Sequence, residues 1–435
     1  MHDTLVMLQE KLLTFTSVFY LFATPLYIIY LGKRSNAVGR AATTLGVIGA
    51  VLHTLGLLFR WWAAGIDHPP FTNLYESLVF FGWGIVVFYL YMEWRHGVKM
   101  AGAFVFPIAL AAMMLAVTHQ EKGIMPLPDA LKSWWLHIHV MFASIAYAAF
   151  VVAFAFSLMY LIKDNVRREV FGAVISAVVA IVFLFLLLRQ GAGYFGLFVM
   201  KQVSIHNGAL MPRVIMDPDT GHREYAYQQI PMVGPVFLGA FAALALAALL
   251  YIVRIRRENT TLDTAAGGAL AAGTALITLG IILIFANVSR MNNVSLKGEP
   301  FLLALIFFMW LIAGGMLMLH YLNAEITGRL PEAENLDFLS YRSVVVAFPL
   351  MTIVIVTGAV WAQSAWGRYW GWDPKETASL VTWFVYAIYL HARIVAGWKG
   401  RPAAIISIVG FLSVIFTYLG VNVFLSGLHS YASSL

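Results

Sequence analysis

The sequence contains no cysteine among its 435 residues, and charged residues make up only 11% of it, against about 25% in average soluble proteins. Without thiols, the chain cannot bind metal through thiolates, relay disulfides or form thioether bonds of its own. Hydrophobic residues account for 61% of the chain. This balance excludes an ordinary soluble enzyme, and any thiol chemistry in which the protein takes part must use the thiols of a partner.

Long apolar runs recur along the whole chain, each near or above the ~20 residues that cross a bilayer as a helix. The first follows the polar start MHDTLVMLQEK, which has neither a basic n-region nor a small-residue cleavage site, so we expect a retained helix rather than a removed signal peptide. The pattern predicts an all-α polytopic membrane protein with about twelve transmembrane helices. The runs fall near 12–31, 43–62, 75–94, 100–118, 138–162, 171–188, 232–253, 265–287, 301–322, 343–363, 376–392 and 402–425.

Lysine and arginine are concentrated in alternate loops, and one set of six loops holds sixteen of the 28 basic residues. Because loops rich in these residues stay in the cytoplasm, both termini are predicted to be extracytoplasmic. The net charge of +7 comes largely from these loops, so it gives no reason to propose nucleic acid as a partner. The loops are 32–42, 95–99, 163–170, 254–264, 323–342 and 393–401.

Two connecting segments are long. Segment 189–231 is mixed polar and aromatic, contains the turn sequence DPDTG, and is predicted to lie outside, where it could form a small cap. Segment 323–342 is typical of a cytoplasmic linker with helical propensity. We divide the chain into an N-terminal helix bundle (1–163), a middle region with the long external loop (164–336) and a C-terminal region (337–435).

The loop WGRYWGWDPKE, near the end of the chain, combines two patterns. Its second half matches a helix start: Asp373 is a favoured N-cap, Pro374 suits the first helical position, and Glu376 stands three residues after the cap, as in a capping box. The segment FTNLYESL repeats the pattern with Asn73 and Glu76. We therefore expect capping to be the main role of the two acidic residues of the loop.

Capping does not account for the aromatic residues of the same loop. An interfacial belt is the ordinary explanation, but belt residues are scattered over helix ends, whereas here they fall within seven residues with glycines between them. A flat aromatic ligand could approach such a surface closely, and carboxylates on its rim could meet Arg368 or Lys375, of which arginine is the better bidentate donor. The aromatic residues are Trp366, Tyr369, Trp370 and Trp372.

Two histidines lie at the same predicted membrane level as this loop. His139 opens a helix from outside, and His429 follows the last helix. Two neutral imidazoles beside an aromatic platform, in a chain without cysteine, suit axial ligation of a haem iron. A lone histidine at a helix end is more often a polar cap, and His137, two positions away on a different helix face, competes with His139.

Three further histidines, His53, His320 and His391, lie within predicted spans. Ionisable residues at such depth are functional candidates. His320 and His391 are near cytoplasmic helix ends, where solvent can satisfy them, and His53 could equally be hydrogen-bonded to a neighbouring helix.

The segment WGRYWGWDPKETASLVTWFVYAIYLHAR resembles the tryptophan-rich WWD signature of haem-handling proteins. The continuation to GVNVFLSGLHSY, and the upstream segments LFRWWAAGIDHPPFTNLYESLVFFGW and WWLHIHVMFASIAYAAF, are similar to the CcsA family of System II cytochrome c synthases. The resemblance implies two external haem-iron ligands, which fall on His139 and His429. It implies a transmembrane haem ligand, which falls on His391. The haem platform of the family falls on Trp366, Trp370, Trp372 and Asp373.

The resemblance also implies cytochrome c biogenesis at the bacterial inner (cytoplasmic) membrane. There, haem b is moved to the extracytoplasmic face and attached through thioether bonds to the CXXCH segment of an apocytochrome c. The substrate supplies both thiols, in agreement with the absence of cysteine, and catalysis requires positioning of haem rather than a nucleophile or acid–base pair. A CcsB-like membrane subunit is the further partner that the family implies.

Residues 164–336 depart from the family pattern and are expected to be an insertion of about four helices with the long external loop. We hypothesise that this region replaces part of the CcsB-like partner, so that His320 or His53 completes an internal haem site with His391.

Two other functions compete. A related haem carrier or exporter would bind haem without ligating it, but the loop WDPKE followed by LHAR favours the synthase branch. A quinol-oxidising subunit of the cytochrome b type would carry paired histidines at a fixed helical spacing, whereas the three histidines within spans stand on separate runs.

Overall fold

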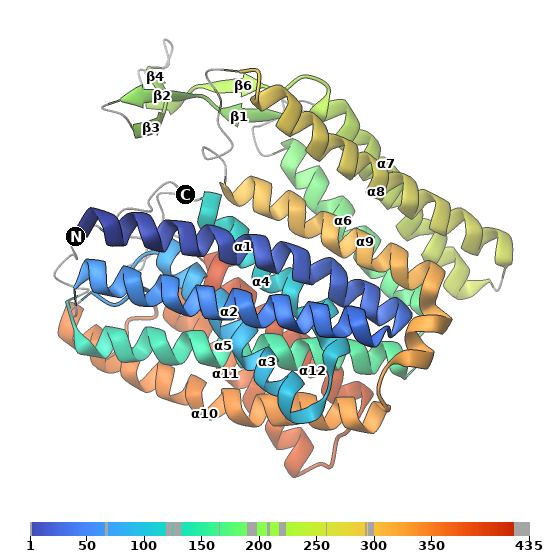
Figure 1. The fold of residues 1–435 in the computed structure, drawn as a ribbon. Helices are drawn as coiled ribbons and strands as arrows, with labels where there is room; N and C mark the ends of the chain where they lie inside the picture. Colours follow the sequence, from blue (N-terminus) through green and yellow to red (C-terminus); the bar gives the residue numbers. More distant parts are fainter. Residues whose placement is uncertain are drawn as a thin grey trace. The chain divides into compact units, whose positions relative to one another are not determined.

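The computed structural model describes residues 2–65, 68–118, 124, 132–164, 166–188, 198–206, 209–216, 223–257, 259–291, 294 and 300–421. Within these residues the chain forms twelve long helices and six short strands (Figure 1). The chain divides into two compact units. Unit 1 comprises residues 1–117, 121–165 and 326–435, and unit 2 comprises residues 118–120 and 166–325.

Unit 1 is a helical bundle in which α5 (Trp134–Lys163) is the central helix. It packs against α3, α10 and α12, and alanines such as Ala148 and Ala153 on its buried surface let neighbouring backbones approach closely. The other helices are α1 (His2–Lys33), α2 (Asn36–Ala64), α3 (Leu74–His96), η1 (Lys99–Ala101), α4 (Gly102–Thr118), α10 (Ala333–Trp366), α11 (Pro374–Ile394), α12 (Arg401–Ile415) and the π-helical turn η5 (Phe416–Gly420).

Unit 2 stacks α7 between α6 and α8. The helices are α6 (Arg168–Leu188), α7 (Val233–Arg256), α8 (Thr260–Val288) and most of α9 (Pro300–Arg329), whose dihedral angles depart from helical values at Leu322. Between α6 and α7, in the segment expected to form a cap, antiparallel pairs join β1 (Val199–Lys201) to β6 (Tyr227–Gln229), β2 (Val203–His206) to β3 (Ala209–Pro212) and β4 (Val214–Met216) to β5 (Arg223–Tyr225). The DPDTG turn lies mostly outside the described residues.

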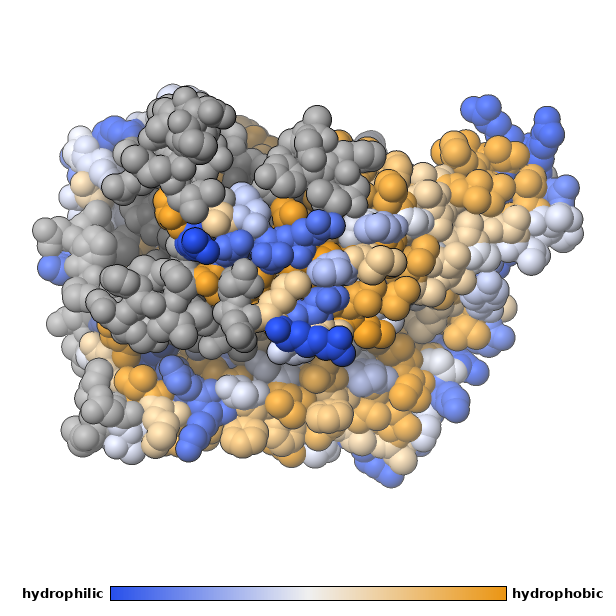
Figure 2. Space-filling view, turned by 90° about the horizontal axis from the view of Figure 1, so that it is seen from above, coloured by the Kyte–Doolittle hydropathy of each residue, from blue (hydrophilic) through white to orange (hydrophobic). Residues whose placement is uncertain are grey.

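Eleven helices of the described residues are long and apolar enough to cross a membrane. Large apolar side chains such as Phe22 and Ile181 are exposed on them, and Figure 2 shows hydrophobic residues widely distributed over the surface. Exposed apolar side chains are favourable in contact with lipid, because the interior of the bilayer is itself apolar and contains no water. The protein is therefore a multi-pass membrane protein, as predicted. Helix α11, which corresponds to the predicted run 376–392, is not among the eleven helices, because its charged and hydroxyl side chains lower its mean hydropathy.

Ten of the twelve helices observed in the described residues are longer than the predicted apolar runs, whereas α4 and α12 are shorter. The segment 323–342, expected to be a linker with helical propensity, is almost wholly helical: α9 continues to Arg329, and α10 starts at Ala333. Arg393 clamps this part of α10 to the end of α11 through a bidentate pair with Asp337, with nitrogen–oxygen distances of 2.7 and 2.6 Å. Polar residues thus extend these helices beyond their apolar runs, which an apolar pattern alone does not reveal. The three-part division of the chain stays a prediction.

Candidate functional site

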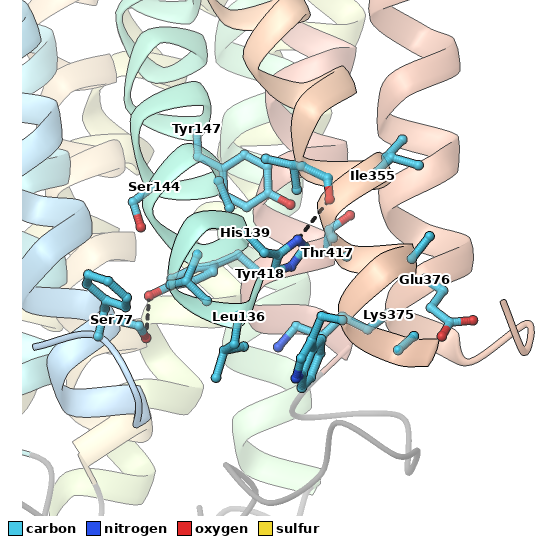
Figure 3. Close-up of a pocket in the computed structure, with 18 of the residues that line it drawn as sticks. Ser77, Leu136, His139, Ser144, Tyr147, Ile355, Lys375, Glu376, Thr417 and Tyr418 are labelled. Carbon is cyan, nitrogen blue, oxygen red and sulfur yellow. Dashed lines mark hydrogen bonds between the residues drawn. The ribbon is translucent and has the colours of Figure 1, made fainter. Parts of the chain in front are cut away.

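A pocket of about 190 Å³ opens at one end of unit 1. It lies where the first turns of α3, α5 and α11 meet the last turns of α10 and the π-helical turn η5 (Figure 3). Its walls are mainly aromatic and aliphatic, with a histidine, a lysine, a glutamate and several hydroxyl groups among them. An apolar enclosure with a few placed polar groups is the usual form of a small-molecule site.

His139 lines this pocket from the second turn of α5. Its Nδ1 donates a hydrogen bond of 2.8 Å to the main-chain oxygen of Val354 on α10. A carbonyl oxygen only accepts, so the proton of the neutral ring is on Nδ1, and Nε2 is the nitrogen with the lone pair. A backbone carbonyl that fixes the tautomer in this way is typical of metal-binding histidines. The imidazole is therefore set up as a ligand through Nε2.

Two residues of α10 hold the His139 ring in place. The indole of Trp361 lies nearly parallel to it, with ring centroids 6.2 Å apart and an angle of 26° between the planes. Gly358 leaves room for the imidazole, because a Cβ atom at that position would lie 2.8 Å from Cε1 and 2.9 Å from Nδ1 of His139. The ring is thus clamped between helices α5 and α10 rather than free to change rotamer.

His137, the competing candidate, is not among the pocket-lining residues. It is 8% exposed and contacts the rings of Phe71 and Trp134, at centroid distances of 6.2 and 5.4 Å. Two residues along a helix turn a side chain by roughly 200°, which explains why only one of the two histidines reaches the pocket.

The loop between α10 and α11 has the predicted helix start. The side chain of Asp373, which is 6% exposed, accepts a hydrogen bond from the main-chain N–H of Lys375 over 3.1 Å. Glu376 Oε2 accepts from the main-chain N–H groups of Asp373 (3.2 Å) and Gly371 (2.7 Å). The capping box is confirmed, and the same carboxylate also ties down the glycine in the middle of the loop.

The tryptophans of the loop take different positions. Trp370 lines the pocket. Trp366 packs against Trp361 with ring centroids 4.8 Å apart, behind the pocket wall. Trp372 is 71% exposed and meets Trp370 edge to face at 5.9 Å; its backbone has a positive φ of 57°. Trp370 and Trp372 therefore do not lie in one plane.

The two basic residues of the loop also lie in different places. Lys375 lines the pocket, whereas Arg368 does not. The guanidinium of Arg368 occupies the space in which a Cβ atom of residue 371 would lie, so Gly371 is required for this packing. Burial lowers the pKa of the Lys375 ammonium to about 8, although the carboxylate of Asp373 raises it.

Hydroxyl groups line the side of the pocket formed by α3, α5 and η5. Tyr418 of η5 is hydrogen-bonded to Ser77 of α3 over 2.9 Å and meets Tyr147 of α5 at 6.3 Å between ring centroids. The neighbouring Thr417 is bonded to Thr382 of α11 over 3.0 Å. π-Helical turns are often found at functional sites, and this one brings consecutive side chains to the pocket.

The wall formed by the start of α3 rests on a buried ion pair. Arg60 of α2 and Glu76 of α3 are 1% and 0% exposed, with 2.7 Å between Nη2 and Oε1. The cap prediction is confirmed at Asn73, whose side chain accepts from the N–H of Glu76 over 2.8 Å. The glutamate itself does not complete a capping box there: its Oε2 accepts from the N–H and hydroxyl of Thr72 instead.

The remaining predicted histidines lie away from this pocket or outside the described residues. His53 is buried and bonded through Nδ1 to Tyr20 of α1 over 3.2 Å. His391 is exposed in the last turn of α11. His320 belongs to unit 2, where its Nδ1 lies 2.9 Å from the hydroxyl of Tyr251. His429 lies outside the described residues, which end at Val421.

Sequence reasoning missed the residues of helix interiors that complete the pocket. Trp361 and Gly358 sit within an apolar run of α10, where such residues are ordinary. Tyr147 and Tyr418 also lie inside apolar runs. The spacing of Gly358, Trp361 and Ala365 at three and four residues is a signal for one helix face, but nothing in the sequence indicates that this face meets His139.

Comparison with known proteins shows that the chain is similar to proteins of cytochrome c assembly. Residues 71–429 match the family described as "Cytochrome C assembly protein". The chain is 31% identical to "Cytochrome c biogenesis protein CcsA" of a Picosynechococcus species, over 97% of both chains. It is also 31% identical to the protein of the same name from Gloeobacter violaceus, over 88% of this chain and 83% of the relative.

The length of the first alignment shows whether residues 164–336 are an insertion compared with the first relative. Because 97% of each chain is covered, this segment is aligned in the Picosynechococcus relative as well, so it is not an insertion relative to that protein. The pocket-lining segments, from Phe71 to Tyr418, all fall within the matched residues 71–429. The chain belongs to the cytochrome c assembly protein family.

Proposed function

We propose that this protein acts in cytochrome c biogenesis as a cytochrome c synthase, which binds haem in the pocket of unit 1 and promotes its attachment to the CXXCH segment of an apocytochrome c. The observation that carries this proposal is His139. Its Nδ1 is held by Val354, its ring is stacked on Trp361, and its Nε2 is the acceptor nitrogen in a pocket lined by aromatic residues. These features suit axial ligation of the iron of a flat macrocycle.

His429 is the proposed second axial ligand. The described residues end at Val421, three residues after Tyr418 of the pocket wall, and His429 follows eight positions later. Eight extended residues span at most about 29 Å, so the chain is long enough to bring this histidine back to the pocket. The pocket and the sequence thus support one ligand from α5 and one from the C-terminal segment.

The reaction needs no oxidant. Each thiol S–H adds across a vinyl group of haem: the sulfur forms a bond to the vinyl carbon next to the ring, the proton goes to the terminal carbon, and the C=C bond becomes a single bond. The protein holds the haem edge and the peptide together, which is catalysis by proximity and orientation. In this mechanism the peptide's own histidine replaces one axial ligand and assists release of the product.

The pocket is proposed to face the extracytoplasmic side of the bacterial inner membrane, because the basic loops lie at the opposite helix ends. His391, in the last turn of α11, is proposed as a transmembrane haem ligand. Its exposed side chain leaves it accessible to haem or to a partner subunit. A CcsB-like membrane subunit is the proposed partner, and His53 and His320 remain candidates for the second ligand.

Co-expression with a CXXCH reporter tests the proposal. Haem that stays on the reporter in a denaturing gel is expected with the wild-type protein and is expected to be lost with His139→Gly. His137→Gly is the matched control, because that residue lies on the same helix but does not line the pocket. A wild-type protein that binds haem but never yields covalent product would instead indicate a carrier or exporter.

A further inference from the structure

Trp372, in the loop between α10 and α11, has a backbone conformation that residues other than glycine rarely adopt. Its φ is 57°, in the left-handed region, which is unfavourable for a residue with a Cβ atom. Such conformations persist where the surrounding structure enforces them, and they cluster at functional sites. The position of the Trp372 side chain is therefore held by its neighbours and is not a local preference of the chain.

The carboxylate of Glu376 enforces this conformation. Its Oε2 accepts hydrogen bonds from the main-chain N–H groups of Gly371 (2.7 Å) and Asp373 (3.2 Å), the residues on either side of Trp372. The carboxylate points away from the side of the pocket where His139 lies (Figure 3). Because both flanking N–H groups are tied to one oxygen atom, the backbone at Trp372 cannot relax without losing hydrogen bonds.

This backbone places the indole of Trp372 on the outside of the loop. The side chain is largely exposed and is not among the residues that line the pocket. It meets the ring of Trp370, which does line the pocket, edge to face at 5.9 Å. Tyr369 also lines the pocket and is 62% exposed. The loop therefore presents exposed aromatic rings directly beside the proposed haem site.

An exposed tryptophan at a membrane surface is ordinarily an anchor in the headgroup region. Trp134, in the first turn of α5, has the form of such an anchor: its side chain is 65% exposed on a regular helix. An anchor of this kind needs no special backbone conformation. Trp372 differs, because a strained backbone held by two hydrogen bonds fixes its indole. A fixed ring suits a specific partner, since less side-chain freedom is lost on binding.

We propose that Trp372 docks the segment of apocytochrome c that carries the CXXCH sequence, and that Glu376 is the positioning residue for this contact. The inference rests on the proposed function, in which both thiols of that segment must reach the edge of haem in the pocket. Tryptophan suits the role because it offers a large, rigid apolar surface and often dominates binding at interfaces. In this arrangement Trp370 faces haem, and Trp372 faces the peptide.

Binding of a fluorescently labelled CXXCH peptide, with serine in place of both cysteines so that no thioether bond forms, tests the docking on purified full-length protein loaded with haem. Trp372→Ala is expected to weaken peptide binding about ten-fold or more, as removal of a tryptophan hot spot does, and to keep the haem content and absorption spectrum of the wild type. Trp134→Ala is the matched control, because that tryptophan is similarly exposed but does not line the pocket. It is expected to change neither property.

Substitutions of Glu376 test the positioning. Glu376→Ala keeps the indole of Trp372 but removes the acceptor of the two flanking N–H groups, so it is expected to weaken peptide binding as well. Glu376→Gln retains a side-chain oxygen that accepts hydrogen bonds and is expected to restore peptide binding. Alanine at this position also removes part of the capping box. Trp372→Ala leaves that box intact, so it tests the docking even if Glu376→Ala does not fold.

A reporter assay separates docking from haem ligation. Excess CXXCH reporter is expected to restore the yield of covalent haem with Trp372→Ala, but not with His139→Gly. Unchanged peptide binding by Trp372→Ala would overturn the inference and assign this tryptophan to the membrane surface. Loss of haem from Trp372→Ala, to the extent expected for His139→Gly, would also overturn it and assign the ring to haem binding. The proposed function would fail on a different result, a wild-type protein that binds no haem and yields no covalent product.

Discussion

The imidazole of His139 on α5 is bonded to the main-chain oxygen of Val354 on α10 across 2.8 Å. This contact joins residues that are 215 positions apart in the sequence, and it determines which ring nitrogen faces a ligand. The orientation of the proposed axial ligand thus depends on how two helices pack rather than on the loop that carries the signature tryptophans.

The space for the His139 ring is tested by Gly358→Ala. The added methyl group would lie 2.8 Å from Cε1 of the ring, so the imidazole must move. We expect haem affinity to fall by about ten-fold, the effect of roughly 1.4 kcal/mol of misalignment, with a changed absorption spectrum. Gly314→Ala on α9 is the control, because an added Cβ there meets nothing within 4 Å. Equal haem affinity in both variants would show that the close packing at Gly358 does not matter.

The affinity for haem is expected to depend on pH through Lys375. Its pKa is about 8 in the unliganded protein, so the charge that attracts a carboxylate is present below pH 8 and is lost as the pH rises through that value. Affinity is therefore expected to fall above pH 8, by up to about ten-fold per pH unit, and to level off at the affinity of the form with an uncharged Lys375, in titrations from about pH 6.5 to 9.5. Other ionisable groups at the pocket are His139, Tyr147, Tyr418, Tyr369, Asp373 and Glu376.

Lys375→Met is the control, because it lacks the amine of Lys375. If haem affinity fell with pH in that variant as it does in the wild type, the pH dependence would belong to another group. The stability of the unliganded protein is expected to change in the opposite sense. The folded-state pKa lies below the ordinary value of 10.5, so the unfolded chain binds more protons between about pH 8 and 10.5, and stability rises with pH in that range.

Substitutions of Asp373 distinguish a structural role of its side chain, as a helix cap, from a direct role in haem binding. As an N-cap it is replaceable by asparagine, which caps helices equally well, whereas alanine costs about 1 kcal/mol. We expect Asp373→Asn to keep wild-type haem content and Asp373→Ala to lower the thermal midpoint of the protein. If asparagine and alanine both removed haem while the fold persisted, the carboxylate would be acting on the ligand and not only on the helix.

The histidines outside the pocket are tested by single alanine variants of His391, His320 and His53. His391→Ala is expected to reduce the haem content of the purified protein without affecting the spectrum of haem at His139. The hypothesis that this chain supplies the second transmembrane ligand requires a similar loss with His320→Ala or His53→Ala. Loss with His391→Ala alone would assign that ligand to the partner subunit.

Much of this architecture is predictable from the sequence because it follows from local chemistry. Apolar runs predict spans, and the caps at Asn73 and Asp373 follow from residue type and spacing. The choice between His137 and His139 is not local, because it depends on the rotation of α5 within the bundle. Likewise, sequence alone could not tell that Arg368 packs over Gly371 and leaves the pocket to Lys375.

The central claim is that His139 is an axial ligand of haem in this pocket. It is tested most directly by the absorption spectrum of His139→Gly, purified from a haem-replete host, with and without imidazole. We predict loss of the haem absorption of the wild type, recovery of it when imidazole fills the vacated position, and a wild-type spectrum for His137→Gly. A wild-type spectrum for His139→Gly without imidazole would contradict the assignment.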